Sequence, residues 1–252
     1  MTRARSAAAG VFTLALCWAG AAAAEPGLGQ TVYTPYVNNG LTEFEVRSGR
    51  LSGGSADGDQ TTVYELEHGF SDRFSLAVLA EVEDEPGAAR KLDAIAVEGV
   101  VYVGQIPGLG IDVGLYGEYE QRIHNESGVA EGKLLLAKTQ DNFQALLNLV
   151  VKKPLTDRPG ENTTEYGYAA STTWEVAPYL RLGLEAFGDL GVAGALGGRQ
   201  AHYIGPMAKW ETHPSWLPAE LEIEAGYLFA AGAARDHTDG QIRLLVALER
   251  RF

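Results

Sequence analysis

Pairs of acidic residues separated by a single residue recur along this 252-residue chain. They include Glu65 and Glu67, Glu118 and Glu120, and Glu222 and Glu224. In a β-strand, residues two apart project from the same face. Each pair would therefore place two carboxylates side by side, and such a surface attracts cations and repels anions. The chemistry indicated is the attraction of charged solutes, and no set of residues predicts a catalytic site.

The charged residues of the candidate strands share one face, and we predict that this face lines a pore. The predicted pore-lining residues are Glu65, Glu67, Glu81, Glu118, Glu120, Lys152, Glu175, Arg181, Glu185, Lys209, Glu222, Glu224 and Arg243. The acidic excess favours a weakly cation-selective pore. An alternative stays open, in which the cations pair with the carboxylates across the lumen and leave little open bore.

The elements that must position these residues are short segments in which apolar and charged residues alternate. In the last of them, Ile242, Leu244 and Val246 fall on one parity and Arg243 and Glu249 on the other. Period-2 alternation predicts β-strands. The twelve candidate strands cover 41–50, 60–68, 74–83, 91–104, 110–121, 129–138, 143–152, 164–176, 179–188, 200–211, 219–230 and 241–252.

The connections between these segments alternate in length, which gives the strands an orientation. Those after even-numbered strands are mostly short turns, and those after odd-numbered strands are mostly longer loops. Bacterial outer-membrane barrels have an even number of strands, short periplasmic turns and longer outer loops. We therefore predict an all-β, transmembrane, antiparallel up-and-down β-barrel of twelve strands, with both termini in the periplasm.

The apolar face carries aromatic residues near the strand ends, such as Phe74, Phe143, Trp174 and Trp210. Aromatic girdles at the two interfaces of the bilayer are typical of membrane barrels. A soluble periplasmic β fold is the alternative, because soluble antiparallel sheets also alternate. The girdle pattern favours the outer membrane of a Gram-negative bacterium.

The first 24 residues have the pattern of a secretory signal peptide. Two arginines precede an apolar run over 7–20, and three alanines over 22–24 precede Glu25. The run is too short to span a bilayer comfortably. We predict a signal peptide over 1–24, an irregular periplasmic lead-in over 25–40 and the barrel over 41–252. Whether the lead-in enters the barrel is left open.

The amino-acid composition limits the partners and cofactors that the mature chain is expected to bind. Cys17, the single cysteine, lies in the predicted signal peptide, so the mature chain would lack disulfides and thiolate metal ligands. Without Arg3 and Arg5, the 20 basic residues become 18 against 33 acidic ones, a net charge of −15. Such a field repels nucleic acid. No cofactor and no metal site is expected, and the five histidines lack the spacing of metal ligands.

One short motif has the residue order of a catalytic site. His213, Pro214 and Ser215 match the His-x-Ser order found in lipid-cleaving barrels. They fall in a predicted periplasmic turn with proline between them, so we interpret them as a turn and predict that the protein is not an enzyme.

Three segments carry a resemblance. Residues 64–74 (YELEHGFSDRF), 202–206 (HYIGP) and 225–228 (AGYL) resemble Gram-negative outer-membrane barrels, and more narrowly the transporter family associated with the MetA pathway of phenol degradation. The resemblance implies an uptake channel for small, apolar or aromatic compounds. It fixes no binding residues. It also implies that the terminal Phe252 is the signal read by the barrel assembly machinery.

Together these patterns predict an outer-membrane, porin-like channel for passive uptake or efflux of small solutes through an acidic lumen. Its expected partners are outer-membrane lipid, the barrel assembly machinery and a small-molecule solute. The alternative, from another class, is a structural or surface-binding barrel with a closed lumen and no transport.

Overall fold

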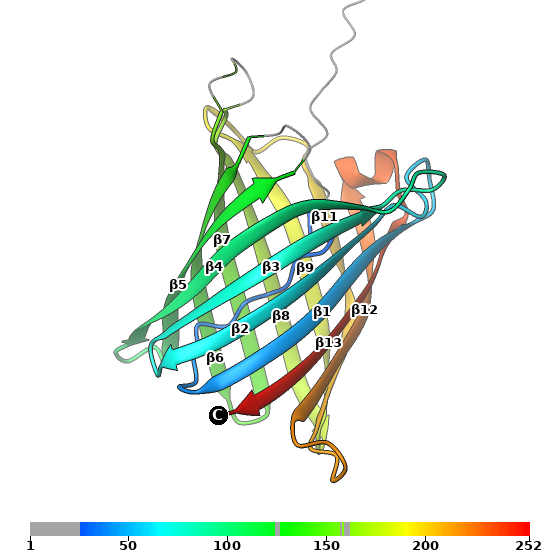
Figure 1. Cartoon of the computed structure of the whole chain (residues 1–252). Coiled ribbons are helices and arrows are strands. Elements are labelled where there is room, and N and C mark those ends of the chain that lie inside the picture. The colour runs from blue at the N-terminus through cyan, green and yellow to red at the C-terminus, as the bar shows by residue number, and fades with distance from the viewer. Residues whose placement is uncertain (1–25, 124–126, 157, 159–161) are drawn as a thin grey trace, which may run out of the picture.

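The structure, a computed structural model, describes residues 26–123, 127–156, 158 and 162–252. The predicted signal peptide lies outside these residues. The strands form one antiparallel sheet that closes on itself as a β-barrel (Figure 1). The last strand pairs with the first from Leu41 opposite Arg251 to Ser52 opposite Gly240. Closure pairs both edges of the sheet, which an open sheet would leave exposed.

The predicted fold class is confirmed, because twelve long strands close the barrel. They are β1 (Leu41–Ser52), β2 (Gln60–Ser71), β3 (Phe74–Asp84), β4 (Lys91–Ile106), β5 (Ile111–Arg122), β6 (Val129–Gln140), β7 (Phe143–Pro154), β8 (Glu165–Ala177), β9 (Leu180–Val192), β11 (Ala201–Thr212), β12 (Glu220–Gly232) and β13 (Gly240–Arg251). Two small elements were not predicted: strand β10 (Ala195–Leu196), which folds back on β9, and the 3-10 helix η1 (Ala233–Asp236).

The two ends of the barrel differ as the sequence predicted. At one end, which we call the turn end, the strands are joined through residues 72–73, 107–110, 141–142, 178–179 and 213–219. At the other, the loop end, they are joined through 53–59, 85–90, 123–128, 155–164, 193–200 and 233–239. The C-terminus lies at the turn end (Figure 1). The two-residue turn at 141–142 places Asp141 at φ 53°, a left-handed conformation that Asp tolerates better than most residues.

A β-bulge shifts the pairing of β3 with β4 beside an acidic residue of β4, Asp93. Glu81 pairs with Ala94 and Val82 pairs with Leu92, so β4 has one extra residue, Asp93, at this point. An extra residue in one strand shifts the parity of everything beyond it. Asp93 is thereby brought close to Glu81 and Glu83, on the charged side of β3.

Gly205 and Pro206 lie in the middle of β11 without breaking the strand. β11 is continuous, and both residues pair with β9. Toward β12, however, the pairing runs from Ile204–Phe229 to Met207–Gly226 and omits the two positions between. Proline lacks the N–H that the ladder requires on one side.

The barrel is inverted relative to a soluble protein. The side chains of Val78 and Leu184, on the outer face, are 55% and 52% exposed, whereas Glu65 and Glu185, on the inner face, are only 4% and 2% exposed. A lipid-facing barrel has this distribution, because lipid takes the apolar face and the lumen takes the charges. In the described part of the chain, no helix is long and apolar enough to cross a bilayer.

Candidate functional site

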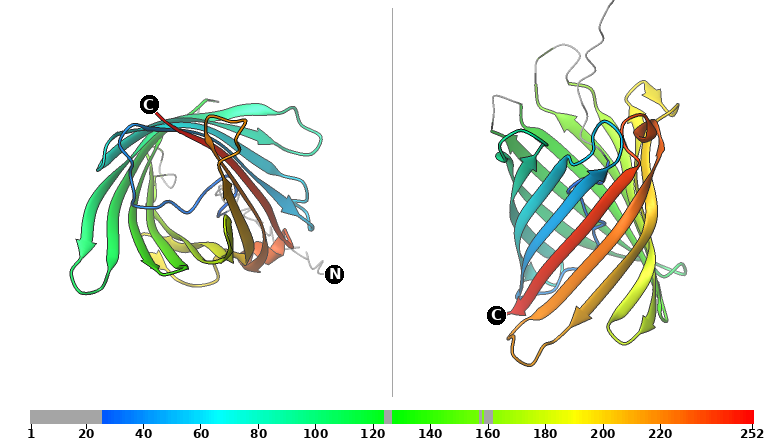
Figure 2. Two further views of the ribbon diagram at one scale, coloured as in Figure 1. Left: turned by 90° about the horizontal axis from the view of Figure 1, so that it is seen from below. Right: turned by 90° about the vertical axis from the view of Figure 1, so that its right-hand side faces the viewer.

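The N-terminal segment 26–40, which we call the lumen segment, runs inside the barrel. Figure 1 shows it behind β1 and β2, and the view along the barrel in Figure 2 shows it within the ring of strands. The sequence suggested a periplasmic lead-in and left open whether it enters the barrel. The described residues of the segment are instead held in the lumen by side chains of the strands, and their sequence could not reveal these partners.

Asn148 of β7 holds the middle of the lumen segment. Its Oδ1 accepts a hydrogen bond from the backbone N–H of Tyr33 at 2.8 Å, and its Nδ2 donates to the carbonyl of Tyr33 at 2.9 Å. The side-chain amide therefore pairs with one residue as a neighbouring strand would. Asn148 is fully buried. It satisfies both polar groups of the Tyr33 backbone where no strand reaches them.

Two arginines hold the beginning of the lumen segment. Arg47 of β1 donates from Nε to the carbonyl of Gly29 at 2.8 Å. Arg243 of β13 donates to the carbonyls of Gly27 and, at 2.5 Å, Gln30. Gly29 and Gly27 have φ of 70° and 85°, left-handed conformations that glycine adopts without strain. The segment therefore turns its carbonyls outward toward the cationic side chains of the wall.

The same two arginines also form ion pairs with carboxylates of the barrel wall. Arg47 forms ion pairs with Glu45, at 2.5 Å, and with Glu65, and Arg243 pairs with Glu185 at 2.9 Å. All of these side chains are buried. Buried charges need partners, because desolvation of a lone ion is costly. Part of the predicted acidic surface is therefore neutralised, as the closed-lumen alternative expected.

A lysine and two tyrosines form a second contact with the lumen segment. Nζ of Lys133 lies 4.1 Å from the ring centroid of Tyr33 and 4.0 Å from that of Tyr116. Both tyrosine hydroxyls donate to Glu98, at 3.1 and 2.7 Å. This cation–π arrangement fixes the Tyr33 side chain against β4–β6.

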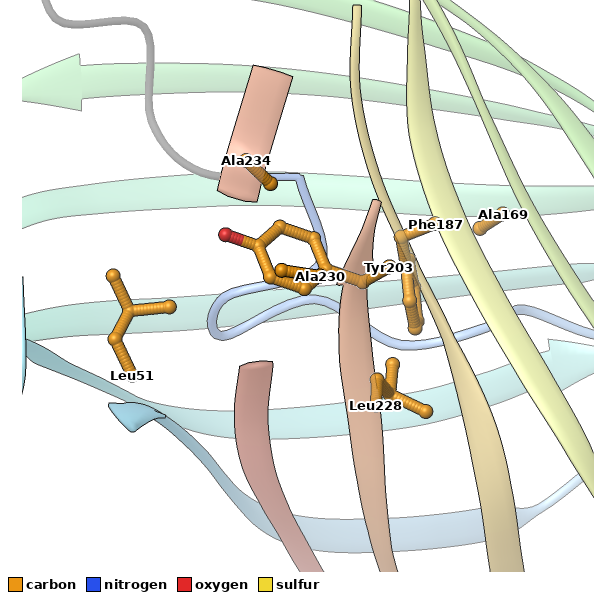
Figure 3. Packing of buried hydrophobic residues seen from close by; sticks show 7 residues of the cluster. All are labelled: Leu51, Ala169, Phe187, Tyr203, Leu228, Ala230 and Ala234. Atoms are coloured by element: carbon orange, nitrogen blue, oxygen red, sulfur yellow. The ribbon is translucent and has the colours of Figure 1, made fainter. Parts of the chain in front are cut away.

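Toward the loop end, a cluster of buried apolar side chains fills part of the lumen. Phe187 of β9, Tyr203 of β11 and Leu228 of β12 are fully buried in one cluster with Ala234 of η1 (Figure 3). Leu28 of the lumen segment packs against this cluster. Above it, Arg199 forms an ion pair with Asp236 at 2.5 Å, and its hydrogen bonds hold the pKa of Asp236 below the usual range.

A cavity of about 440 Å³ lies between the lumen segment and the turn-end halves of the strands. The segment contributes residues between Thr31 and Asn38. Among the predicted pore-lining residues, those that line the cavity are Glu65, Glu67, Arg181, Glu185, Lys209, Glu222 and Glu224. The structure therefore brings about half of the predicted set together in one space.

The remaining predicted residues are on the inner face but outside this cavity. The carboxylate of Glu118 lies beside the hydroxyl of Tyr116, Glu120 pairs with Arg122 at 3.0 Å, and Lys152 pairs with Glu131 at 3.1 Å. Glu81 joins Glu83 and Asp93 in a group of carboxylates whose oxygens lie within 4.8 Å of one another. Nζ of Lys91 lies 3.0 Å from Oε2 of Glu83 and places a positive charge beside this group of carboxylates.

Two further predicted residues lie near the ends of their strands. Glu175 is exposed near the turn end, where Nη1 of Arg181 lies 3.6 Å from its carboxylate. Arg243 contacts the lumen segment and Glu185, as described above. Whether any of these residues lines a path for solutes stays a prediction.

Several residues that shape the lumen were not in the predicted set. Tyr33 and Asn148 are the main ones, and Ser171 of β8 also lines the cavity. The signal for Asn148 was present, because it is a single amide in an otherwise apolar run from Ala145 to Val151. Tyr33 left no such signal, since nothing in 25–40 predicts which strand it contacts.

The terminal residue and the His213 motif are at the turn end. Phe252 is 77% exposed, and its backbone N–H donates to the carbonyl of Gly40 at 2.9 Å. Nε2 of His213 lies 3.2 Å from the carboxylate of Glu220, within the connection that was predicted to be a turn. The assembly role of Phe252 stays a prediction.

The barrel is similar to solved outer-membrane porins and channels. An outer membrane channel of the COG4313 group from Pseudomonas putida F1 superposes with a TM-score of 0.58 at 11% identity, over 90% of this chain and 99% of that one. The NanC porin gives 0.55 at 8% identity, over 83% and 100% of the chains, and the KdgM porin 0.52 at 11%, over 83% and 99%. The fold is that of outer-membrane porins.

Sequence comparison adds no family to this result. No family model matches the chain, and no curated protein matches it significantly. At these identities the likeness concerns the fold, and the narrower resemblance to the MetA-pathway transporters stays a prediction.

Proposed function

We propose that the protein is an outer-membrane channel of a Gram-negative bacterium that passes small solutes through an acidic lumen. The turn end would face the periplasm and the loop end the outside. The main support is the inverted barrel with a cavity inside it, lined by Glu67, Glu222 and Glu224. Lipid and the assembly machinery would be its partners, and the resemblance to the MetA-pathway transporters agrees with a transport role.

The carboxylates of the cavity would give the channel a cation preference. Lumen charges raise the local concentration of counter-ions and repel ions of like charge. Arg181 and Lys209 are the cations of the cavity wall, but Lys209 is already paired with Glu222 at 2.8 Å and Glu211 at 3.1 Å. The cavity wall therefore has more carboxyl groups than cations.

A closed barrel without transport is the second candidate function, and the lumen segment favours it. The segment occupies the lumen and is held by Asn148, Arg47 and Arg243. Single-channel recording in planar bilayers separates the two candidates. Discrete conductance with a cation-selective reversal potential under a salt gradient is expected for the channel, and folded protein that conducts nothing would favour the closed barrel.

The Glu222→Gln/Glu224→Gln variant tests the origin of the preference. It removes two cavity carboxylates and frees Lys209, so we expect the reversal potential to move toward the anion side. The matched control is Glu85→Gln, which neutralises an exposed carboxylate in loop 85–90 and should leave the potential unchanged. An unchanged potential in the double variant would mean that these residues do not border the ion path.

A further inference from the structure

We propose that the lumen cavity is a binding site for a small hydroxylated organic cation, that is, an ammonium compound that also carries hydroxyl groups. This inference deepens the proposed function and rests on it for its biological meaning. The binding itself follows from two facing walls of the cavity that differ in chemistry. One wall offers carboxylates without cations, and the other offers neutral hydrogen-bonding groups.

The first wall contains a row of carboxylates set directly opposite one another. In the sheet register, Glu43 of β1 lies opposite Glu67 of β2 on one side and opposite Glu249 of β13 on the other. All three line the cavity. Like charges in directly opposed positions are destabilising. A cation in the cavity would relieve this repulsion.

The protein does not supply that cation from its described residues. None of Glu43, Glu67 and Glu249 forms an ion pair with a described lysine, arginine or histidine, whereas Glu45 and Glu65 in the next row share Arg47. Lys209 is engaged by Glu222 and Glu211. The row therefore presents three carboxyl groups to the cavity without a cation of its own.

The facing wall, from β7 and β8, places the hydroxyl group of Ser171 against the cavity. Ser171 lines the cavity and is only 8% exposed, and its hydroxyl makes no hydrogen bond with any described residue. Gln144 lines the same wall, and its amide also lacks a described partner. Buried polar groups are nearly always hydrogen-bonded. A ligand with hydroxyl groups would satisfy them.

Size and charge define the class of ligand. A cavity of about 440 Å³ is in the range of small-molecule sites. An inorganic cation would satisfy the carboxylates but leave Ser171 and Gln144 without partners. A neutral sugar would do the reverse. One solved porin with this fold is described in complex with disordered oligogalacturonate, a polyanion, and the carboxylate wall of this chain would repel such a ligand.

Three probes of similar ring size separate these requirements. Glucosamine carries both the ammonium and the hydroxyl groups, glucose lacks the charge, and cyclohexylammonium lacks the hydroxyls. Isothermal titration calorimetry of the folded protein in detergent, at mildly acidic pH, measures binding without any conductance. We expect the Kd of glucosamine to be at least about tenfold lower than that of either other probe.

Two variants test which wall of the cavity binds the ammonium group and which binds the hydroxyl groups. Glu43→Gln/Glu249→Gln should weaken glucosamine and cyclohexylammonium alike, whereas Ser171→Ala should weaken glucosamine and leave cyclohexylammonium unchanged. Glu85→Gln is the control that changes neither. Equal binding of glucosamine and glucose, or an unaltered glucosamine affinity in Ser171→Ala, would overturn the inference. A different result would contradict the proposed function. A barrel that binds glucosamine but conducts no current contradicts the channel proposal and leaves the binding inference intact.

Discussion

At the scale of single residues, Asn148 determines how a segment without secondary structure is held inside the barrel. Its amide makes two hydrogen bonds to the backbone of Tyr33, and no water competes at a fully buried position. Net contributions of such bonds are modest, but an unpaired backbone group left behind is expensive.

Asn148→Ala should therefore destabilise the protein by about 1–3 kcal/mol, because the N–H and carbonyl of Tyr33 lose their partners. Urea unfolding of the protein in detergent measures the loss. The Gln144→Ala variant of the same strand is the control, since the Gln144 amide makes no hydrogen bond with a described residue, and it should change stability by no more than about 0.5 kcal/mol. A loss equal to that of Asn148→Ala would argue against the two-bond clamp.

At the scale of elements, the pairing of β11 with β12 depends on Gly205. A Cβ at this position would lie 2.0 Å from the carbonyl oxygen of Tyr227. Gly205→Ala should therefore push the two strands apart and cost about 1–3 kcal/mol. Heat-modifiable mobility in gels and urea unfolding would both report it.

Gly117 of β5 provides the matched control for that substitution. A Cβ there meets nothing within 4 Å. Gly117→Ala should change stability by no more than about 0.5 kcal/mol. If both alanine variants were equally unstable, the close approach at Gly205 would not be the cause.

The lumen segment is the element that would limit conduction. Deletion of 28–37 keeps the predicted cleavage site and removes the residues that contact Asn148 and Lys133. We expect single-channel conductance to rise about two- to fivefold, because the bore widens. Deletion of 195–198, a hairpin end that pairs only with β9, should leave conductance unchanged. The segment does not limit the path if both deletions behave alike.

At the scale of the whole molecule, the negative charge inside the barrel should act through the electrostatic field. The Debye length falls from about 10 Å at 0.1 M salt to about 3 Å at 1 M. The cation preference should therefore be strong in 0.1 M KCl and weak in 1 M KCl. A preference that did not change with salt would contradict an origin in the lumen carboxylates, and uptake of a neutral sugar is the salt-independent reference.

The sequence predicted the barrel well because residues on the two faces of a strand alternate along the sequence. The alternation of residues such as Ile242, Arg243 and Leu244 does not depend on the register of the strand. Each candidate strand is confirmed, with ends shifted by a few residues. Asp93 shows the limit. A single bulge changes the parity of a side chain, and the sequence records only that the pattern is broken.

The site was predicted in part, for the same reason. Parity assigned Glu67, Lys209 and Glu224 to the inner face, and they line the cavity. Parity cannot tell how far along the barrel a residue lies or what stands opposite. It therefore grouped Glu81 and Glu120 with the cavity residues, although they lie outside it.

The sequence by itself determined which face of each strand is apolar, where the strands turn and how the charges are divided between lipid and lumen. These are local properties of period 2. The tertiary structure decided that segment 26–40 lies inside the barrel, that Asn148 meets Tyr33 across 115 positions of sequence, and that Arg47 and Arg243 divide their charge between the segment and the wall. Such contacts depend on closure of the sheet, which brings distant strands around one segment, and no local pattern encodes them.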